Sequence, residues 1–517
     1  MVRVTTAAQA SAIDQRAIAG GTASYVLMTA AGRAAATVLR DRYADEVSRG
    51  VLIFAGPGNN GGDGYVVAGE LAAAGVDVSV VSFGEPRSDD AKRARSELPA
   101  SVRVHAWADG PADSRAKRIK GAVLVDALVG TGAAGVPRDG IAEGIASMRT
   151  ARAAGMPVVA LDVPSGVDAT TGATSGSVAG ADLTITFGTV KRGLLRNRDA
   201  SGAIVAVDIG LGAAADDESA PTLVDAARAL DAVPAIGAAA HKGTRRRLLI
   251  IGGAPGMLGA AILSARGALR SGIGMVKVCA HPDGLDAIQS AEPAVLTAPW
   301  PESDAALQDL LAWAHGVLIG PGLGLSDAQQ SLASRVLSAW RGPIVVDADA
   351  LSAFAGNAEA LGALLTGRPA LITPHAVEAE RLVGLKSADL DAGRFDSAAL
   401  IASRARCAVL LKGVPTVVTD ARRTLVVAAG TPVLGTAGSG DVLAGIAATL
   451  LAQTGDALAS GATAAWVHGR AAEIAGQGAV RGASLDDVVA ALRHAWQRPA
   501  PLDAPVLAEL PAVGTRP

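Results

Sequence analysis

The stretch that decides the fold of the first half is VLIFAGPGNNGGDGYVVAGEL, Val51 to Leu71. Its apolar start predicts a strand, and the segment from Tyr65 onward predicts a helix. Between them, Gly56 to Gly64 contains five glycines and two adjacent asparagines. Glycines let a backbone approach a ligand and turn its N–H groups toward anions, and the start of a helix adds positive potential. We interpret the stretch as strand, loop and helix.

Four interpretations of this loop are weighed: a dinucleotide fingerprint, a Walker A loop, an anion-binding loop and a tight turn. GPGNNG matches the dinucleotide fingerprint G-x-G-x-x-G, but that unit also needs an acidic residue near the end of the second strand. Here Asp77 lies at the start of that strand, and only Glu85 follows it. No Gly-Lys-Ser/Thr follows the glycines, which excludes a Walker A loop. An anion-binding loop and a simple tight turn remain.

The rhythm of the whole chain predicts two α/β domains, at residues 1–215 and 225–500. Short apolar runs alternate with Ala-rich helical segments, which is typical of parallel sheets covered on both faces. The small and acidic residues LGAAADDESAP interrupt this rhythm and predict a linker near residues 212–225. The expected strands are VLIFAG, DVSVVSF, AVLVDAL, PVVALDV, DLTITF and AIVAVDI, then RRLLIIGG, GMVKVCA, GVLIG, PIVVDA, ALITP, AVLLKG, TVVTD and TLVVAAG.

Composition narrows the classes of function. The 517 residues are 50% hydrophobic and 18% charged, with a net charge of −3 and 3% aromatics. We therefore expect a globular protein that binds neither nucleic acid nor membrane. Its two cysteines form no metal-binding pattern, and its N-terminus lacks an apolar leader, so we expect the cytoplasm.

Three expected strand ends in the first half carry glycine-rich or oxygen-rich loops. Asp126 precedes the loop Gly130–Val136, and Asp162 and Ser165 follow the next strand. Ligands of open parallel sheets bind at the carboxyl ends of strands, so these loops predict one site together with the opening stretch.

The motifs GPGNNGGDG, VDALVGTG, LDVPSGVDATTG and TFGTVKRGLL resemble the NAD(P)H-hydrate epimerase family over most of residues 1–210. The resemblance implies a Rossmann-like three-layer αβα domain and a bound potassium ion held by Asn60, Asp126 and Ser165. Asp162 becomes the candidate acid/base, because epimerisation at C6 moves protons of the hydrated ring; a turn carboxylate is its structural alternative. Where the family has LMENAG this chain has LMTAAG, with Thr29 and Ala30.

The same resemblance assigns a larger set of residues to the substrate. They are Asn59, Asn60, Gly61, Gly62, Asp63, Gly130, Thr131, Gly132, Ala133, Ala134, Gly135 and Val136.

In the second half, GTAGSGDVLAGIAATLLAQ is the most informative stretch. A Gly-Ser-Gly-Asp turn at a helix start brings backbone N–H groups and the Asp441 carboxylate together. Such an arrangement stabilises a transferring phosphoryl group and takes a proton from an attacking hydroxyl. The structural alternative is that Asp441 is a plain acidic residue of the first helical turn.

In their order, HKG, IGGAPGMLGAA, GPGLG, DADAL, TPHAVE, LKG and GSGD resemble the ADP/ATP-dependent NAD(P)H-hydrate dehydratase family over roughly residues 225–490. The resemblance implies a ribokinase-like αβα domain that uses ADP or ATP with Mg²⁺, and it makes Asp441 the catalytic base. It also places Ala260, Gly324 and His375 against the hydrated nucleotide, although a lone histidine is often structural. The nucleotide would be held by Lys412, Gly413, Val414, Pro415, Thr416 and Gly440.

Together, the two resemblances imply a nicotinamide nucleotide repair enzyme. The first domain would interconvert the R and S epimers of NADHX and NADPHX, and the second would dehydrate the S form. Family members often associate, so we expect a homo-oligomer. Two alternatives stay open: a ribokinase-like small-molecule kinase with an attached nucleotide-binding domain, and a non-catalytic nucleotide sensor.

Overall fold

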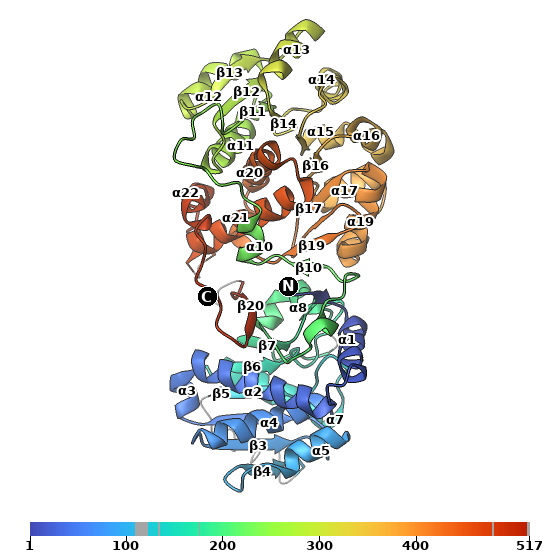
Figure 1. Ribbon diagram of the computed structural model, residues 1–517, viewed down its shortest axis with the longest axis vertical. Helices are drawn as coiled ribbons and strands as arrows, with labels where there is room; N and C mark the ends of the chain where they lie inside the picture. The colour runs from blue at the N-terminus through green and yellow to red at the C-terminus, as the bar shows by residue number, and fades with distance from the viewer. Residues whose placement is uncertain (109–122, 133–134, 175, 478–479, 514–517) are drawn as a thin grey trace. The chain divides into compact units, whose positions relative to one another are not determined.

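The computed structural model describes residues 1–108, 123–132, 135–174, 176–477 and 480–513 (Figure 1). These residues form two compact units, Met1–Leu223 with Ala500–Val513, and Val224–Pro499. Each unit is built on its own mainly parallel sheet with helices on both faces, so the predicted α/β class is confirmed. Among the described residues, no helix is both long and apolar enough to cross a membrane.

The sheet of the first unit has the strand order β20-β9-β7-β6-β5-β2-β3-β4, and its neighbours are parallel except for the pair β20 and β9. Six of these strands are the six apolar runs expected from the sequence; β4 and β20 were not predicted. The strands are β2 (Val51–Ala55), β3 (Val78–Ser82), β4 (Arg103–Ala106), β5 (Val123–Ala127), β6 (Val158–Leu161), β7 (Leu183–Phe187), β9 (Ala203–Val207) and β20 (Val506–Leu510).

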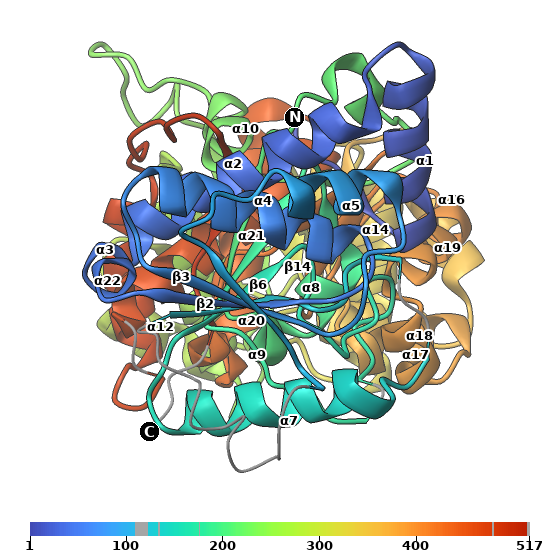
Figure 2. The same cartoon turned by 90° about the horizontal axis from the view of Figure 1, so that it is seen from below.

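Helices cover both faces of this sheet. Helices α2, α4 and α5 lie on one face and α7 on the other (Figure 2). Successive side chains of β2 point to opposite faces of the sheet. Ile53 therefore packs into the hydrophobic core on one face, and Phe54 packs into the core on the other. The unit's helices are α1 (Ala7–Ala19), α2 (Ser24–Arg42), α3 (Ala44–Ser48), α4 (Asn59–Ala73), α5 (Asp89–Ser96), α7 (Asp139–Ala153), α8 (Arg192–Arg196) and α9 (Arg198–Ser201).

Helix α4 begins at Asn59 and not, as expected from the sequence, at Tyr65. Most of the glycine-rich run is therefore helical. The glycines allow close packing: a Cβ on Gly61 would lie 1.9 Å from the carbonyl oxygen of Gly56, and one on Gly64 would lie 2.7 Å from Cβ of Ala127. The helix thus starts pressed against the ends of β2 and β5.

The second sheet contains β19-β18-β17-β16-β15-β14-β11-β12-β13 in spatial order, antiparallel only between β17 and β18 and between β18 and β19. All eight strands expected in this half are present, and β13 was not predicted. The strands are β11 (Arg247–Ile251), β12 (Met275–Ala280), β13 (Leu296–Pro299), β14 (Gly316–Ile319), β15 (Ile344–Val346), β16 (Ala370–Ile372), β17 (Ala408–Leu411), β18 (Thr416–Thr419) and β19 (Thr424–Val427).

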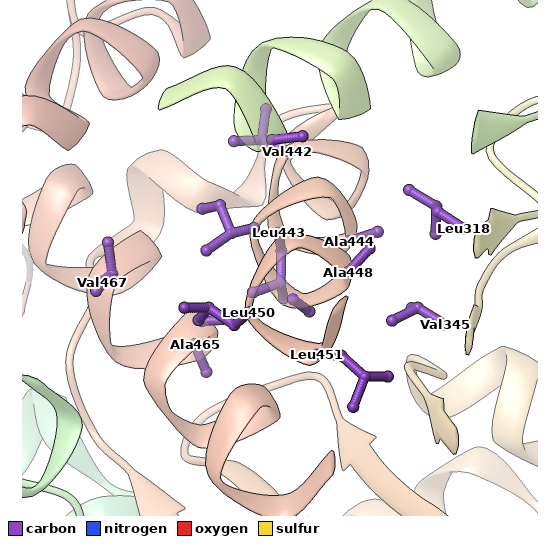
Figure 3. Close-up of a cluster of buried hydrophobic side chains, with 14 of the residues drawn as sticks. Leu318, Val345, Val442, Leu443, Ala444, Ala448, Leu450, Leu451, Ala465 and Val467 are labelled. Carbon is purple, nitrogen blue, oxygen red and sulfur yellow. The ribbon is translucent and has the colours of Figure 1, made fainter. Parts of the chain in front are cut away.

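Helix α20 (Ser439–Thr454) is the centre of the second core. Figure 3 shows its side chains between Leu318 and Val345 of the sheet and Ala465 and Val467 of α21. Glycine permits its contact with α11, because a Cβ on Gly445 would lie 2.0 Å from the carbonyl oxygen of Ser264. A helix buried on nearly every side holds its first turn firmly, and Asp441 lies in that turn.

The other helices of this unit surround the same sheet. They are α10 (Ala226–Asp231), α11 (Leu258–Arg270), α12 (Leu285–Ala291), α13 (Asp304–Trp313), α14 (Asp327–Ala339), α15 (Asp349–Ser352), α16 (Ala358–Leu365), α17 (Ala376–Val383), α18 (Ser387–Ala392), α19 (Arg394–Ala405), α21 (Ala457–Gly476) and α22 (Leu485–Ala495).

Two candidate active sites

In the first unit, Asp126 and Ser165 form a buried pair at the ends of neighbouring strands β5 and β6. The Ser165 hydroxyl donates to Oδ1 of Asp126 at 2.6 Å, and the Ser165 backbone N–H donates to Oδ2 at 2.8 Å. Both residues are almost fully buried, at 2% and 1% exposure. Burial raises the pKa of Asp126, although these hydrogen bonds oppose the rise.

Asn60, in the first turn of α4, lies close to this strand edge. A Cβ on Gly130 would lie 3.2 Å from Cγ of Asn60 and 3.2 Å from Oδ2 of Asp162, so Gly130 fits between the two side chains. Asn60 is buried, and among the described residues neither atom of its amide has a hydrogen-bond partner. A buried amide without a partner is rare in native proteins, so this side chain is a candidate for binding an ion or water.

Asp162 follows β6 directly and has a positive φ of 64°, in the left-handed region. Its Oδ1 lies 2.5 Å from Nζ of Lys191, and its Oδ2 accepts hydrogen bonds from the Thr131 backbone N–H, at 3.0 Å, and the Thr131 hydroxyl. Burial alone would raise the pKa of Asp162, but the Lys191 ammonium and these hydrogen bonds lower it below its ordinary value. Asp162 is therefore a carboxylate at neutral pH.

Two more carboxyl groups share this site. Burial and then the charge of Asp162 raise the pKa of Asp63 on α4 well above its usual range. Burial also raises the pKa of Asp14 on α1, with Lys191 opposing the rise. Asp63 belongs to the predicted set, whereas no motif in the sequence pointed to Asp14. The site combines a carboxyl group whose pKa is lowered with two carboxyl groups whose pKa values are raised.

The remaining predicted residues of the first unit have mixed surroundings. Asn59, Gly132, Gly135 and Val136 are exposed. Gly62 packs toward α2, where a Cβ would lie 2.6 Å from the Met28 side chain. Ala133 and Ala134 lie outside the described residues.

In the second unit, Asp441 lies partly buried in the first turn of α20, after Gly438 with a φ of 88°. Burial raises the pKa of Asp441 to about 7; the nearby Asp347 adds to the rise, and Lys412 opposes it. A carboxyl group with a pKa near neutrality is well suited to accept a proton from a hydroxyl.

Lys412, at the end of β17, connects several groups of this site. Its Nζ lies 2.9 Å from Oδ1 of the buried Asp347 and 3.6 Å from Oε2 of Glu378. A Cβ on Gly440 would lie 3.4 Å from the same Nζ, which places the lysine beside the Gly-Ser-Gly-Asp turn. Asp347 belongs to the motif DADAL and Glu378 to TPHAVE, but neither residue was predicted from the sequence to have a role.

His375 caps helix α17. Its Nδ1 accepts hydrogen bonds from the backbone N–H groups of Val377 and Glu378, at 3.1 and 3.3 Å, and its own N–H donates to the Glu378 carboxylate at 2.8 Å. This reciprocal cap is a structural role of the kind the sequence analysis left open. The side chain is 51% exposed, and its Nε2 lies 3.6 Å from Oε1 of Glu378.

The other predicted residues of the second unit lie around the same edge of the sheet. Gly324, with a φ of 92°, donates its N–H to Oδ2 of Asp349 at 2.8 Å. Ala260 lies against the same turn, 3.1 Å from a Cβ placed on Gly322. In the predicted nucleotide loop Lys412–Thr416, Val414 is 63% exposed and the Thr416 hydroxyl donates to the Gly413 carbonyl at 3.1 Å.

Two family models match the chain. The one described as NAD(P)H-hydrate dehydratase matches residues 248–493, and the one described as YjeF-related protein N-terminus matches residues 24–193. The chain is 35% identical over 489 residues to the Bifunctional NAD(P)H-hydrate repair enzyme Nnr of Escherichia coli, covering 92% of this chain and 90% of that protein. The protein of the same name from Salinibacter ruber is also 35% identical, with 91% of each chain covered.

Solved structures are similar to part of the chain. The ADP/ATP-dependent NAD(P)H-hydrate dehydratase of Bacillus subtilis, co-crystallised with ATP/Mg²⁺, has 24% identity and a TM-score of 0.47, covering 53% of this chain and 98% of that chain. Yeast ynu0 has 24% identity and a TM-score of 0.37, covering 40% and 88%.

Proposed function

This chain belongs to the family of bifunctional NAD(P)H-hydrate repair enzymes, and from that premise we propose how its two sites divide the reaction. The chain is an NAD(P)H-hydrate epimerase and dehydratase. Residues 1–215 form the epimerase domain, and residues 225–500 form the dehydratase domain. This division is supported by the two matched regions, 24–193 and 248–493, each of which contains one of the sites described above.

Asp162 is the base of the epimerase site. C6 of the hydrated ring carries both a hydroxyl and N1, so it is a hemiaminal that opens and re-closes. Asp162 takes the hydroxyl proton as the C6–O double bond forms, the C6–N1 bond breaks, and N1 gains a proton; the reverse steps on the other face of C6 give the other epimer. The observation that carries this assignment is the ionised, buried Asp162 at a strand end.

Asp63 is the proton donor of the same reaction. Neighbouring carboxyl groups whose pKa values move in opposite directions are typical of acid–base pairs. The raised pKa of Asp63 suits the donation of a proton to N1, and the lowered pKa of Asp162 suits a carboxylate that takes the hydroxyl proton. The exposed loop residues Gly132, Gly135 and Val136, together with Asn59, hold the rest of the substrate.

A potassium ion fits beside this pair. Asn60, Asp126 and Ser165 offer the hard oxygen ligands that such a cation prefers, and the unpartnered Asn60 amide supports the assignment. When bound, the ion supplies positive charge for the anionic part of the substrate. Ser165 and Asp126 hold each other in place through their two hydrogen bonds, which keeps these oxygens fixed.

Asp441 is the base of the dehydratase site. It takes the proton of the C6 hydroxyl, whose oxygen then bonds to the terminal phosphorus of ADP or ATP as the bridging P–O bond breaks. Phosphorylation turns hydroxide, a poor leaving group, into phosphate. The C6–O bond then breaks with its electrons on phosphate, and loss of a C5 proton restores the dihydronicotinamide ring. Lys412–Thr416 and Gly440 hold the nucleotide, and Ala260, Gly324 and the exposed part of His375 contact the hydrated ring.

Magnesium enters this site with the nucleotide. Among the described residues, no cluster of three His, Cys, Asp or Glu side chains forms a metal site. Lys412 already neutralises Asp347 and lies near Glu378. Mg²⁺ is commonly held by substrate phosphates and water with few protein ligands, which suits this arrangement.

The experiment that tests both assignments uses acid-hydrated NADH or NADPH with both epimers present. Recovery of absorbance is followed with and without ADP or ATP. Nucleotide-dependent recovery of both epimers, faster than spontaneous epimerisation, supports both sites. A stable phosphorylated product would favour a small-molecule kinase. Recovery of one epimer alone would indicate that the first domain is inactive.

We place the reaction in the cytoplasm and the enzyme in a homo-oligomer, as family resemblance implies.

A further inference from the structure

Lys191 was not assigned any role from the sequence, yet it is one of the most buried charged groups of the first unit. Its side chain is 3% exposed. Its ammonium lies 2.5 Å from Oδ1 of Asp162 and donates to the Thr186 hydroxyl at 3.1 Å and the Phe187 carbonyl at 3.0 Å. One ion pair and two hydrogen bonds therefore surround this ammonium inside the protein.

Pairing between two short strands holds the backbone of Lys191 in place. Strand β8 (Val190–Lys191) pairs in parallel with β1 (Val4–Thr5), and Thr5 lies opposite Lys191. The hydroxyls of Thr5 and Thr189 lie 2.8 Å apart and add a side-chain bond to this pairing. The amino-terminal strand therefore holds the lysine backbone in place.

The two oxygens of Asp162 have partners of different kinds. Oδ1 faces the buried ammonium of Lys191, whereas Oδ2 accepts from Thr131, a partly exposed residue of the loop after β5. A bond to a partly exposed loop exchanges for a bond to substrate more readily than a bond to a buried, strand-held ammonium.

We propose that Lys191 is the positioning residue of the epimerase site: its ammonium holds Oδ1 of Asp162, so that Oδ2 exchanges its bond from Thr131 for one from the C6 hydroxyl of the substrate. This inference rests on the proposed role of Asp162 as the base. It gives Lys191 no bond to make or break in the reaction.

The charges around the pair agree with this role. Asp63 from α4 and Asp14 from α1 face the same site. Without Lys191, three carboxyl groups would share it with no ammonium between them, and like charges at short range disfavour ionisation. Lys191 therefore keeps the buried Asp162 carboxylate ionised and leaves Oδ2 as the oxygen that can bind substrate.

The test is a double-mutant cycle with Lys191→Met and Asp162→Asn, read by the conversion of purified R epimer to S epimer. We expect Lys191→Met to lower kcat on the order of 100-fold with a much smaller change in KM, because the base is lost and substrate contacts remain. In the Asp162→Asn background the same change has no further effect, because its action runs through Asp162. Additive losses, or a loss confined to KM, would contradict the proposal.

Two controls keep the result clear. Lys92→Met removes an exposed lysine of the same unit that pairs with Asp89 at 3.0 Å, and it leaves epimerisation unchanged. Dehydration of pure S epimer by the same variants reports that the second unit is intact, and denaturant unfolding reports whether the first unit is folded. If Lys191→Met does not fold, Thr186→Val removes one acceptor of the ammonium, and we expect a several-fold loss of kcat that again vanishes in the Asp162→Asn background.

The outcomes separate the inference from its premise. If Asp162→Asn keeps full epimerase activity, the proposed function of Asp162 is wrong. If Asp162→Asn is inactive while folded Lys191→Met or Thr186→Val keeps the wild-type kcat, only the role of Lys191 is wrong.

Discussion

Each site contains a buried or partly buried lysine and a candidate catalytic aspartate, but the lysine has a different partner in each. In the first site Lys191 lies 2.5 Å from Asp162 itself. In the second, Lys412 lies 2.9 Å from Asp347, and Asp441 is left beside that pair. The pKa of Asp162 is consequently lowered, while burial and Asp347 raise the pKa of Asp441 to about 7.

This difference shows that residue type alone does not set the charge of a catalytic group. Burial raises the pKa of both aspartates, and the pKa of Asp162 is lowered only because Lys191 and the Thr131 hydrogen bonds outweigh burial. The epimerase needs a base that is always ready next to a separate acid. The dehydratase needs a base that accepts a proton from a hydroxyl during phosphoryl transfer.

The largest expected effect comes from removing each base. Asp162→Asn should lower epimerisation, and Asp441→Asn should lower nucleotide-dependent dehydration, each by roughly 10²–10⁴-fold. Each variant should keep the other activity, measured on purified epimers. A variant that loses both activities while it remains folded would show that the sites do not act separately.

Dependence on pH gives the next largest effect and separates the two sites directly. Asp441 acts as a base, so dehydration needs its ionised form and rises with pH. With a pKa of about 7, kcat/KM for dehydration should increase about 10-fold between pH 6 and pH 8. Epimerisation should show no acidic limb from Asp162 in this range, because the pKa of that group is lowered. If the two activities had the same pH profile, the proposed contrast between the pKa values of Asp162 and Asp441 would be wrong.

Removal of potassium should have a smaller effect, confined to the first site. Exchange of K⁺ for tetramethylammonium should lower epimerisation several-fold and leave the charge state of Asp441 untouched. Asn60→Ala should reduce both the rate and its response to K⁺, because the amide is the side chain without a partner. An unchanged K⁺ response in Asn60→Ala would argue against this ligand.

The smallest expected change in rate comes from altering the packing of α20, the helix that carries Asp441. Gly445→Ala places a Cβ 2.0 Å from the carbonyl oxygen of Ser264, so α20 must shift. We expect a loss of about 1–3 kcal/mol of stability, read by denaturant unfolding, and a modest loss of dehydration with epimerisation retained. Gly259→Ala on α11 is the matched control, since a Cβ there meets no atom within 4 Å.

Much of this could be predicted from the sequence because parallel strands buried on both faces appear as continuous apolar runs. Asp126, Asp162 and Asp441 were identifiable as candidates because each stands at the end of such a run or at a glycine-marked helix start. The start of α4 was predicted too late, since five glycines in nine residues are more typical of a loop than of a helix. Here close packing outweighs that propensity.

Contacts between distant parts of the chain could not be predicted. Asp162 and Lys191 are separated in sequence by strand β7, and only the fold brings them together. The capping role of His375 did leave a signal, since Glu378 follows three residues later as in a capping box. Strand β20 could not be predicted, because the sequence beyond residue 500 contains no extended apolar run that marks it as part of the first sheet.

The central claim is that the direct contact with Lys191 lowers the pKa of Asp162, whereas burial and Asp347 raise the pKa of Asp441 despite Lys412. Carboxyl ¹³C NMR titration of the full chain labelled at aspartate, with Asp162→Asn and Asp441→Asn to assign the two resonances, tests it most directly. We predict that the resonance lost in Asp441→Asn titrates near pH 7 and that the one lost in Asp162→Asn titrates below the ordinary value of about 3.9. Titration of both carboxyl groups at the same pH, or in the reverse order, would contradict the account.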